Sequence, residues 1–449
     1  MLPDVALLPP NAGFTHSTAN LGVTMDFFPP GHGHSGGQLT IAGERADELA
    51  QAYGTPLLVL DLQQIDASVA RLRGACDPHG VRISYAAKAL LIVALARRLD
   101  RLGLAIDVCS LGELATAQRA GIAPERITFH GAGKSDAELQ AALDGRVGRT
   151  IVDSLDELRR LAHMQPRSPL SIVLRLNTGI EAHTHDFIRT AGDNSKFGIA
   201  PHEEPAALAL LTSEPMLRLS GLHAHIGSQI YQGAPFAANA EGLMEAMGRF
   251  MRAGAQIETL ILGGGFGIPT HPDASDERLD LDAAIAGAVQ RVRERADDLG
   301  LPIPRLEIEP GRTIVGNAGT SLYRVMAIKR YDRRTFVIVD GSLADNPRPA
   351  LYGAQHYVVP TRTGNHATHE VTLCGRSCEN DELGAARLPT DLAQGDLLAM
   401  CSTGAYTYSM ASNYNRFARP AVIAVGDGPP RVYARRETTD DILRCDVDD

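Results

Sequence analysis

Long hydrophobic runs are missing from the 449-residue sequence: the longest uninterrupted apolar stretch extends only from Ala89 to Ala96. A helix of that length is far too short to cross a bilayer. The N-terminus, MLPDVALLPP, also lacks the early lysine or arginine of a secretory signal. We therefore expect a cytoplasmic protein that does not enter the membrane.

Cysteine is scarce, and its six residues are scattered along the chain, at Cys76, Cys109, Cys374, Cys378, Cys401 and Cys445. Such scattering excludes a disulfide framework. Cys374 and Cys378 stand four residues apart, but no second Cys or Cys/His pair with zinc-site spacing accompanies them. His32 and His34 lie in a stretch whose Pro and Gly favour a loose arm over a metal site. The sequence thus predicts no metal centre.

An excess of positive charge is absent as well. Lys and Arg number 43 against 53 Asp and Glu, for a formal net charge of −10, which argues against a nucleic-acid binder with a basic surface. Hydrophobic residues make up 44% and charged residues 21%, proportions that exclude a disordered chain. The length allows two to three domains, or one large barrel with an addition. These features indicate a soluble protein, and we expect an enzyme.

Short β-branched runs alternate with helical stretches through the middle of the chain. The predicted strands are 81–87, 104–110, 126–131, 149–153, 170–177, 219–226, 259–265 and 305–311. Eight strands, each separated from the next by a helix, predict a parallel (β/α)8 barrel. A doubly wound open sheet is the alternative, but the strand order shows no natural split to support it.

The flanking regions have a different texture. Residues 1–37 are rich in Pro and Gly without a clear period, so we expect an irregular arm. The barrel is expected over 38–312, although the first strand and helix near 38–62 could join a second domain. From residue 313 to 449 helices nearly vanish and strand-like pieces follow one another, which predicts an antiparallel β domain.

Polar side chains gather where the predicted barrel strands end. They are Lys88, Asp107 with Ser110, His130, Asp153, Asn177, His225 with Ser228, Gly263–Gly265, and Glu309 with Arg312. Each has an ordinary structural explanation when taken alone. Because the carboxyl ends of barrel strands meet at one mouth, their coincidence predicts a binding site for a polar ligand there.

Three of these features together suggest a cofactor. Lys88 follows the first barrel strand in the apolar string SYAAKALL, a setting that favours the neutral amine needed for a Schiff base with an aldehyde. Its alternative is a helix-start lysine that extends into solvent. GGGFG at 263–267 could bind phosphate after strand seven, or merely make a tight turn. Glu309 and Arg312 in EPGR could form a surface ion pair, but the carboxylate could instead face a cationic heterocycle. Lysine, phosphate site and carboxylate are the parts that pyridoxal phosphate requires.

The sequence resembles the barrel-type pyridoxal-phosphate decarboxylases of the alanine racemase-like fold, most closely the bacterial diaminopimelate decarboxylases. The similar strings occur in the family's order from about residue 38 to 445. They are SYAAKAL, IDVCSLGEL, HGAGKS, NSKFGI, GLHAHIGSQI, LGGGFGI, EPGRTIVGNAG, DNPRPALYGA, CGRSCEN and GAYTYSMASNYN. The first 37 residues match nothing in the family.

The resemblance implies roles in holding pyridoxal 5'-phosphate. Lys88 would form the Schiff base, His225 would stack on the pyridine ring, and Glu309 would keep the ring nitrogen protonated. The phosphate would be bound by Ser228, Gly264, Gly265, Tyr406 and the amides of Gly311 and Arg312. For His225, a satisfied core histidine is the alternative.

The resemblance also implies how a substrate would be held. Arg312, Arg348 and Tyr352 would bind a distal carboxylate, with Tyr406 beside them, and guanidinium–carboxylate bonds are worth roughly 1.5–3 kcal/mol each. Glu379 would bind the distal ammonium and Cys378 would donate a proton. In this family the last two reach into the neighbouring subunit's site, so a homodimer with shared active sites is implied.

The activity implied is that of a carboxy-lyase converting meso-2,6-diaminopimelate to L-lysine and CO2, the last step of lysine biosynthesis. Two strings depart from the family. Its Cys-Glu-Ser-Gly-Asp string reads Cys-Glu-Asn-Asp-Glu at 378–382, and its HGNNKS reads HGAGKS. The first departure suggests a different local turn, and the second removes two side-chain amides near the barrel mouth.

Three alternatives remain open at this point. A non-catalytic homologue should have lost Lys88 or the glycines, and an amino-acid racemase usually places an arginine where Glu309 stands. A family member that decarboxylates another amino acid in secondary metabolism could keep every one of these residues. The sequence leaves that last choice unsettled.

Overall fold

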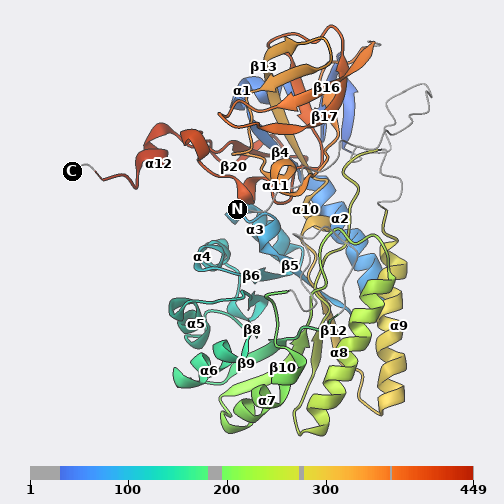
Figure 1. Ribbon diagram of the computed structural model, residues 1–449, viewed down its shortest axis with the longest axis vertical. Coiled ribbons are helices and arrows are strands. Elements are labelled where there is room, and N and C mark those ends of the chain that lie inside the picture. The colour runs from blue at the N-terminus through green and yellow to red at the C-terminus, as the bar shows by residue number, and fades with distance from the viewer. Residues whose placement is uncertain (1–30, 180–194, 273–277, 365–366, 448–449) are drawn as a thin grey trace, which may run out of the picture.

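The structure is a computed structural model that describes residues 31–179, 195–272, 278–364 and 367–447. It has two parts, a barrel and a large sheet, and the sheet lies above the barrel in Figure 1. None of the helices in these residues is both long enough and apolar enough to cross a membrane.

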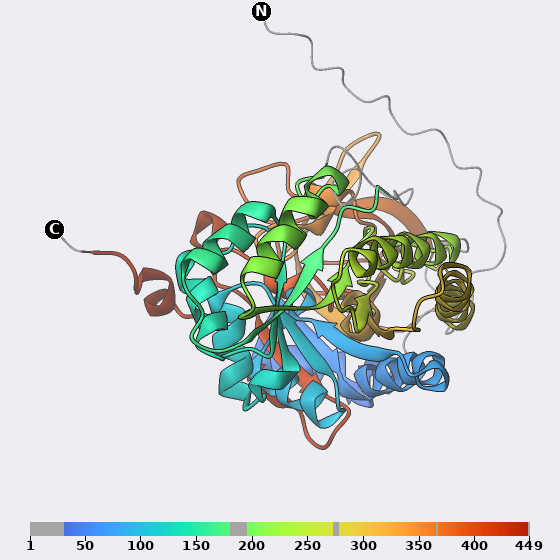
Figure 2. The same cartoon turned by 90° about the horizontal axis from the view of Figure 1, so that it is seen from below.

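Eight parallel strands close into a barrel in chain order, and the last pairs with the first. They are β5 (Arg82–Ala86), β6 (Ala105–Val108), β7 (Ile127–Phe129), β8 (Arg149–Val152), β9 (Leu170–Arg175), β10 (Leu217–His223), β11 (Thr259–Ile261) and β12 (Arg305–Ile308). The helices that connect and surround them (Figure 2) are α3 (Val93–Arg101), α4 (Leu111–Ala120), α5 (Asp136–Leu143), α6 (Leu155–His163), α7 (Glu204–Ser213), α8 (Ala234–Arg252) and α9 (Leu281–Leu299). The predicted (β/α)8 barrel is confirmed, and the open sheet is excluded.

Serine caps explain where three barrel helices begin. Ser110, Ser135 and Ser154 stand at the N-caps of α4, α5 and α6, and each side chain accepts a bond from a glutamate amide three residues on. A capped first turn satisfies amides that would otherwise be unpaired, so the S-x-x-E strings fix where these helices start. The strand ends, and with them the barrel mouth, are thereby held in place.

The second part is a nine-stranded mixed sheet. Its strands are β4 (Leu57–Asp61), β13 (Gly319–Arg330), β14 (Thr335–Val339), β15 (Val358–Pro360), β16 (Thr368–Cys374), β17 (Glu382–Pro389), β18 (Leu397–Met400), β19 (Ala421–Val425) and β20 (Arg431–Ala434). Most pairs are antiparallel, as expected, but β4 with β19 and β14 with β16 are parallel. The short helices α10 (Arg312–Val315), α11 (Arg348–Tyr352) and α12 (Thr439–Leu443) lie in this half of the chain.

Strand β4 joins the two parts because both of its faces are buried. Leu58 and Leu60 belong to the main core that includes the barrel helices, whereas Leu57 and Val59 belong to a second core cluster within the sheet. The strand is followed by α2 (Leu62–Cys76), which leads into the barrel. The sequence alone does not decide whether residues 38–62 belong to the barrel or to the second domain, and the structure shows that Leu57–Asp61 is a strand of the sheet.

Two expectations differ from the structure. The arm expected over residues 1–37 ends earlier, because His32–Ser35 forms β1 and pairs with β2 (Gln38–Ile41), which in turn pairs with β3 (Glu44–Arg45) before α1 (Ala46–Tyr53). Residues 1–30 lie outside the described part of the chain. Strands β15 and β17 were not predicted, since β15 is short and β17 carries alanines and glycine that weaken a strand pattern.

Candidate active site

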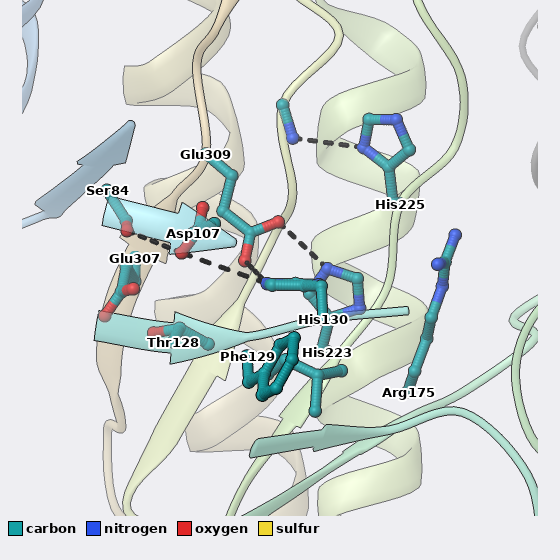
Figure 3. A network of polar contacts seen from close by, with 12 residues as sticks. Ser84, Asp107, Thr128, Phe129, His130, Arg175, His223, His225, Glu307 and Glu309 are labelled. Atoms are coloured by element: carbon teal, nitrogen blue, oxygen red, sulfur yellow. Dashed lines mark hydrogen bonds and ion pairs between the residues drawn. The ribbon is translucent and has the colours of Figure 1, made fainter. Parts of the chain in front are cut away.

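Glu309 lies at the carboxyl end of the barrel, where two imidazoles hold it (Figure 3). Nε2 of His223, the last residue of β10, lies 3.0 Å from Oε2 of Glu309 and is hydrogen-bonded to it. Nε2 of His130, which follows β7, lies 3.0 Å from Oε1, although neither of these two atoms has an aligned hydrogen bond. The two rings meet edge to face with their centroids 5.2 Å apart. Three separate strands thus converge on one carboxylate.

The charges at this cluster follow from burial and from these contacts. Burial alone would favour the neutral acid, but the interactions with His130 and His223 hold the pKa of Glu309 well below its ordinary value. Burial lowers the pKa of His223 to about 4 and also lowers the pKa of His130. The cluster is therefore an ionised carboxylate held by neutral imidazoles.

Asp107, at the end of β6, is the neutral acid beside this anion. Burial and the charges of Glu309 and Glu307 raise the pKa of Asp107 well above its ordinary value. Ser84 donates a bond to its Oδ1 at 2.6 Å. Deeper in the barrel, Glu307 pairs with Arg149. Glu309 is consequently the anion that remains to face a cation at the mouth.

The glycine run after β11 brings two backbone segments closer than any side chain would allow. A Cβ on Gly264 would lie 2.1 Å from the carbonyl oxygen of Glu309, and one on Gly265 would lie 2.2 Å from that of Gly227. The amide of Gly264 donates a 3.1 Å bond to Nδ1 of His225. This amide, expected to face phosphate, is therefore engaged in fixing the ring, which leaves the His225 proton on Nε2.

His225 is half-buried at the mouth, and its charge state follows from its surroundings. Burial, followed by the charges of Lys88 and Arg175, lowers the pKa of His225 well below its ordinary value. The ring is therefore a neutral flat surface, suited to stacking rather than to proton transfer.

Lys88 lies in the short helical turn Ala87–Ala89 that follows β5, and its side chain is exposed. The expectation of an apolar surrounding is wrong for the side chain itself, because only the flanking alanines are buried. Two site segments hold this turn. Gly311 packs so closely that a Cβ on it would lie 3.0 Å from that of Ala89, and the amide of Tyr406 donates a 2.8 Å bond to the Ala89 carbonyl.

Two guanidinium groups lie together beside Tyr406. Arg312 and Arg348 are each only 8% exposed, and their guanidinium carbons lie 4.7 and 5.8 Å from the centre of the Tyr406 ring. Arg348 also lies 5.6 Å from the ring centre of Tyr352. Burial and the charge of Arg312 lower the pKa of Arg348 to about 10. The structure thus brings together all four residues expected around a distal carboxylate.

Neither arginine has an anionic partner in the described ranges. Arg312 donates one bond, 3.3 Å long, to the hydroxyl of Ser228, and its buried Nε has no partner there. Burying two like charges side by side is costly unless an anion compensates them. The pair therefore forms a binding site for an anionic group.

Cys378 and Glu379 are not brought to this mouth within one chain. Both are exposed in the turn between β16 and β17. The amide of Cys378 donates to Oδ1 of Asn415 at 3.1 Å, and the hydroxyl of Tyr414 bonds Glu379. Within the described ranges, no hydrogen bond or ion pair joins either residue to Lys88 or Glu309.

The residues at the mouth fit pyridoxal phosphate. An ionised Glu309, with one buried oxygen lacking an aligned donor, suits a protonated ring nitrogen. Glycines 264 and 265 leave no room for side chains where a phosphate would approach the backbone. Lys88 offers an accessible amine from the turn after β5, the strand that pairs with β12.

His223 is the residue that the sequence analysis missed, and His130 had no role assigned there. A signal was available, since His223 and His225 are two apart in the predicted strand 219–226, and the strand period puts such residues on one face. The strand period could have placed His223 inside the barrel with His225. Its partner Glu309 comes from a strand 86 residues away, which no local pattern reveals.

Comparison with known proteins places the chain in a family. A family model described as the pyridoxal binding domain of pyridoxal-dependent decarboxylases matches residues 62–316. A diaminopimelate decarboxylase of Actinosynnema pretiosum subsp. auranticum is 40% identical over 451 residues, covering 99% of this chain and all of that protein. One from Bacillus subtilis is 40% identical, covering 93% of this chain and 96% of its own.

Solved structures agree with this placement. Diaminopimelate decarboxylase from M. jannaschii in complex with L-lysine superposes with a TM-score of 0.88 at 29% identity, covering 94% of this chain and 98% of that one. A lysine/ornithine decarboxylase from Vibrio vulnificus, at 23% identity and a TM-score of 0.72 over 84% and 96% of the two chains, shows the shared fold alone. The chain belongs to the pyridoxal-dependent decarboxylase family, in the branch of the diaminopimelate decarboxylases.

Proposed function

We propose that this chain uses pyridoxal phosphate to decarboxylate meso-2,6-diaminopimelate to L-lysine and CO2, the last step of lysine biosynthesis. The cytoplasmic location expected from the sequence is part of the same proposal. The observation that carries it is the pair of buried arginines without an anionic partner in the described residues. Meso-diaminopimelate has a carboxylate at each end, so one can leave while the other stays bound.

Arg312, Arg348 and Tyr352 would bind the distal carboxylate and thereby direct the other end of the substrate toward Lys88. The planar guanidinium groups of the two arginines can each donate to both oxygens of a carboxylate. Tyr406 lies beside both guanidinium groups and its amide bonds the Lys88 turn, so it would link substrate binding to the reacting end. A fixed distance between the two ends selects for chain length.

The cofactor, when bound through Lys88, supplies an electron sink for the pair of electrons that the departing CO2 leaves behind. Glu309 would hold a proton on the ring nitrogen, and His223 and His130 would keep that carboxylate ionised and oriented. His225 would cover one face of the ring. Ser228, Gly265, Tyr406 and the amides of Gly311 and Arg312 would hold the phosphate.

Cys378 and Glu379 would complete the site of a neighbouring subunit, which makes the active form a homodimer. This arrangement is supported by the exposure of both residues and by their hydrogen bonds, which go to Asn415 and Tyr414. Sγ of Cys378 would return a proton to the reacting carbon, and Glu379 would bind the distal ammonium. Mixing Lys88→Ala and Cys378→Ala subunits should restore part of the activity, since some heterodimers would contain one intact site. No recovery despite proven subunit exchange would contradict the shared site.

The activity is tested by incubating the cofactor-loaded enzyme with meso-diaminopimelate, ornithine, arginine and lysine in parallel. We expect equimolar L-lysine and CO2 from meso-diaminopimelate, measured by mass spectrometry and by CO2 release. Arg348→Ala should weaken this turnover strongly, whereas Arg324→Ala, at a half-buried position on β13, serves as the matched control. Turnover of another amino acid in preference to meso-diaminopimelate would overturn the assignment.

A further inference from the structure

The turn that carries Cys378 and Glu379 has little packing of its own. Both side chains are exposed, as is that of Asn380, so no apolar contact there sets the position of the turn. Its conformation must come from hydrogen bonds to its backbone. The next residue, Asp381, is by contrast only 4% exposed.

The Asp381 carboxylate binds two separate loops. Its Oδ1 accepts a 2.6 Å bond from the amide of Leu343, and its Oδ2 accepts a 3.0 Å bond from the amide of Ser377. Its carbonyl oxygen accepts a further 2.8 Å bond from the amide of Gly375. A carboxylate with each oxygen on a backbone amide makes charge-assisted bonds, which are stronger than neutral ones. This single buried side chain closes the turn at both ends.

The second loop bound by Asp381 leads to the arginine site. Leu343 lies in the segment 341–347, which Ser342 and Asp345 tighten by a 2.6 Å bond from the Ser342 amide to the Asp345 carboxylate. Helix α11, with Arg348 as its first residue, follows directly. Asp381 therefore lies between the loop that precedes the substrate arginine and the turn with the proposed proton donor.

We propose that Asp381 is a positioning residue that fixes the Cys378–Glu379 turn for use in the neighbouring subunit's active site. This inference rests on the proposed function and on the shared site described above. It accounts for the departure from the family string, since the carboxylate here stands three residues after Cys378, one position earlier than in Cys-Glu-Ser-Gly-Asp. The turn is rebuilt around a buried acid at the new position.

Asp381→Asn retains the shape of the side chain but presents an amide donor to one of the two backbone donors. We expect kcat for meso-diaminopimelate to fall at least about tenfold and KM to rise, because Cys378 and Glu379 both lose their position. The bound pyridoxal phosphate, measured by absorbance, should remain stoichiometric. Asp332→Asn, the same change in an exposed turn, is the control and should leave all three quantities unchanged.

A second variant perturbs the same contact while leaving the acid in place. A Cβ on Gly375 would lie 2.3 Å from Oδ2 of Asp381 and 2.6 Å from Cα of Ser342, so Gly375→Ala should displace the carboxylate together with the loop it binds and reproduce the defect. If a variant instead fails to hold the cofactor, while the kinetics of its cofactor-loaded fraction are unchanged, the substitution has loosened the sheet in general. That result in both variants would overturn the positioning role.

Subunit mixing gives the decisive result. A heterodimer of Asp381→Asn and Lys88→Ala subunits contains one complete site. In that site Lys88 comes from the Asp381→Asn subunit, and the intact turn comes from the Lys88→Ala subunit. Activity should therefore recover to the level reached by the Cys378→Ala and Lys88→Ala mixture. If that reference mixture recovers but the Asp381→Asn mixture does not, Asp381 acts within its own chain through the Arg348 loop, and the proposal is overturned. If neither recovers, the shared site itself is wrong, and this role with it.

Discussion

Glu309 shows how a single residue acquires a defined charge inside a barrel. It is buried, which favours the neutral form, yet two imidazoles from other strands outweigh burial and keep it ionised. For the neighbouring Asp107, burial and the charges of Glu309 and Glu307 outweigh the hydrogen bond from Ser84, so its pKa is raised instead. Two acids that both lie near His130 therefore take opposite protonation states because of their contacts, and only one can stabilise a cation.

Replacing Glu309 by glutamine should remove that anion with little change in shape. We expect kcat to fall by about a hundredfold to a thousandfold, the loss typical when one preorganised electrostatic contact is removed. The cofactor should still bind, so absorbance before and after dialysis separates the chemical effect from cofactor loss. Glu258→Gln, at an exposed position immediately before β11, should behave like the unchanged protein.

Lys88 is exposed at the mouth and so is open to reagents. Borohydride should fix the cofactor to Lys88, and peptide mass mapping should find the adduct on the peptide SYAAKAL. Lys88→Ala should abolish turnover and leave the fold intact, because an exposed side chain contributes little to core burial. Lys329→Ala, at the exposed end of β13, should remain fully active. An adduct on any other lysine would refute the role of Lys88.

At the scale of elements, the mouth is built from turns whose geometry excludes side chains. The turn after β11 passes so near Glu309 and Gly227 that only glycine fits at 264 and 265. That turn fixes both the His225 ring and the segment where phosphate would lie. A substitution in this turn should therefore lower the affinity for the cofactor more than it lowers the stability of the barrel core.

Gly264→Ala should weaken pyridoxal phosphate binding strongly, because the new methyl group must move the Glu309 backbone from a 2.1 Å clash. Titration of the apoenzyme with cofactor, followed by absorbance, measures the loss, and we expect at least about tenfold. Gly287→Ala in α9 meets nothing within 4 Å and should leave the affinity unchanged, with slightly higher stability from the better helix former. Equal affinities for the two variants would contradict the close approach inferred here.

The sequence predicted the elements that local patterns encode and missed those that depend on distant partners. The eight barrel strands followed from their periodicity, and the S-x-x-E caps fix three helix starts. The place of β4 could not be predicted, because both of its faces are buried and a continuous apolar run does not say which sheet it joins. The Glu309–His223 contact and the bond from the Leu343 amide to Asp381 likewise join residues far apart in sequence.

At the scale of the whole molecule, stability should depend on pH through buried histidines. His356 is buried, and its Nδ1 lies 3.1 Å from the carbonyl oxygen of Cys401. Burial, together with the charge of Arg348, lowers the pKa of His356 to about 3. Below an unfolded-state value near 6.5, the unfolded chain takes up a proton that the folded chain refuses. Stability from this group is therefore present above pH 6.5 and lost as the pH falls toward 3.

His356→Asn keeps a donor for the Cys401 carbonyl and removes the titration. On going from pH 7.5 to pH 5, the variant should lose about 2 kcal/mol less stability than the unchanged protein, as measured by urea unfolding. His163→Asn, at an exposed position on α6, should follow the unchanged protein. The same pH response in His356→Asn as in the unchanged protein would show that His356 is protonated in the folded state.

The residues proposed to bind the cofactor and the substrate come from both halves of the chain. The barrel provides Lys88 and Glu309, the segment after it provides Arg312, and the sheet region provides Arg348, Tyr352 and Tyr406. Specificity for a substrate with two carboxylates is thus a property of the whole molecule. A buried guanidinium left without its anion is costly, so a substrate that lacks the distal group should be rejected more strongly than one that lacks a methylene.

The ratio of kcat/KM for meso-diaminopimelate to that for D-lysine tests this account most directly. Because the product is L-lysine, the carboxylate that leaves belongs to the D centre, and D-lysine keeps that centre and lacks only the distal carboxylate. We predict a ratio of at least about a thousand, allowing roughly 4 kcal/mol for the lost contacts. Arg348→Ala should narrow the ratio, mainly by lowering the value for meso-diaminopimelate. D-lysine decarboxylated as efficiently as meso-diaminopimelate would contradict the role assigned to the arginine pair.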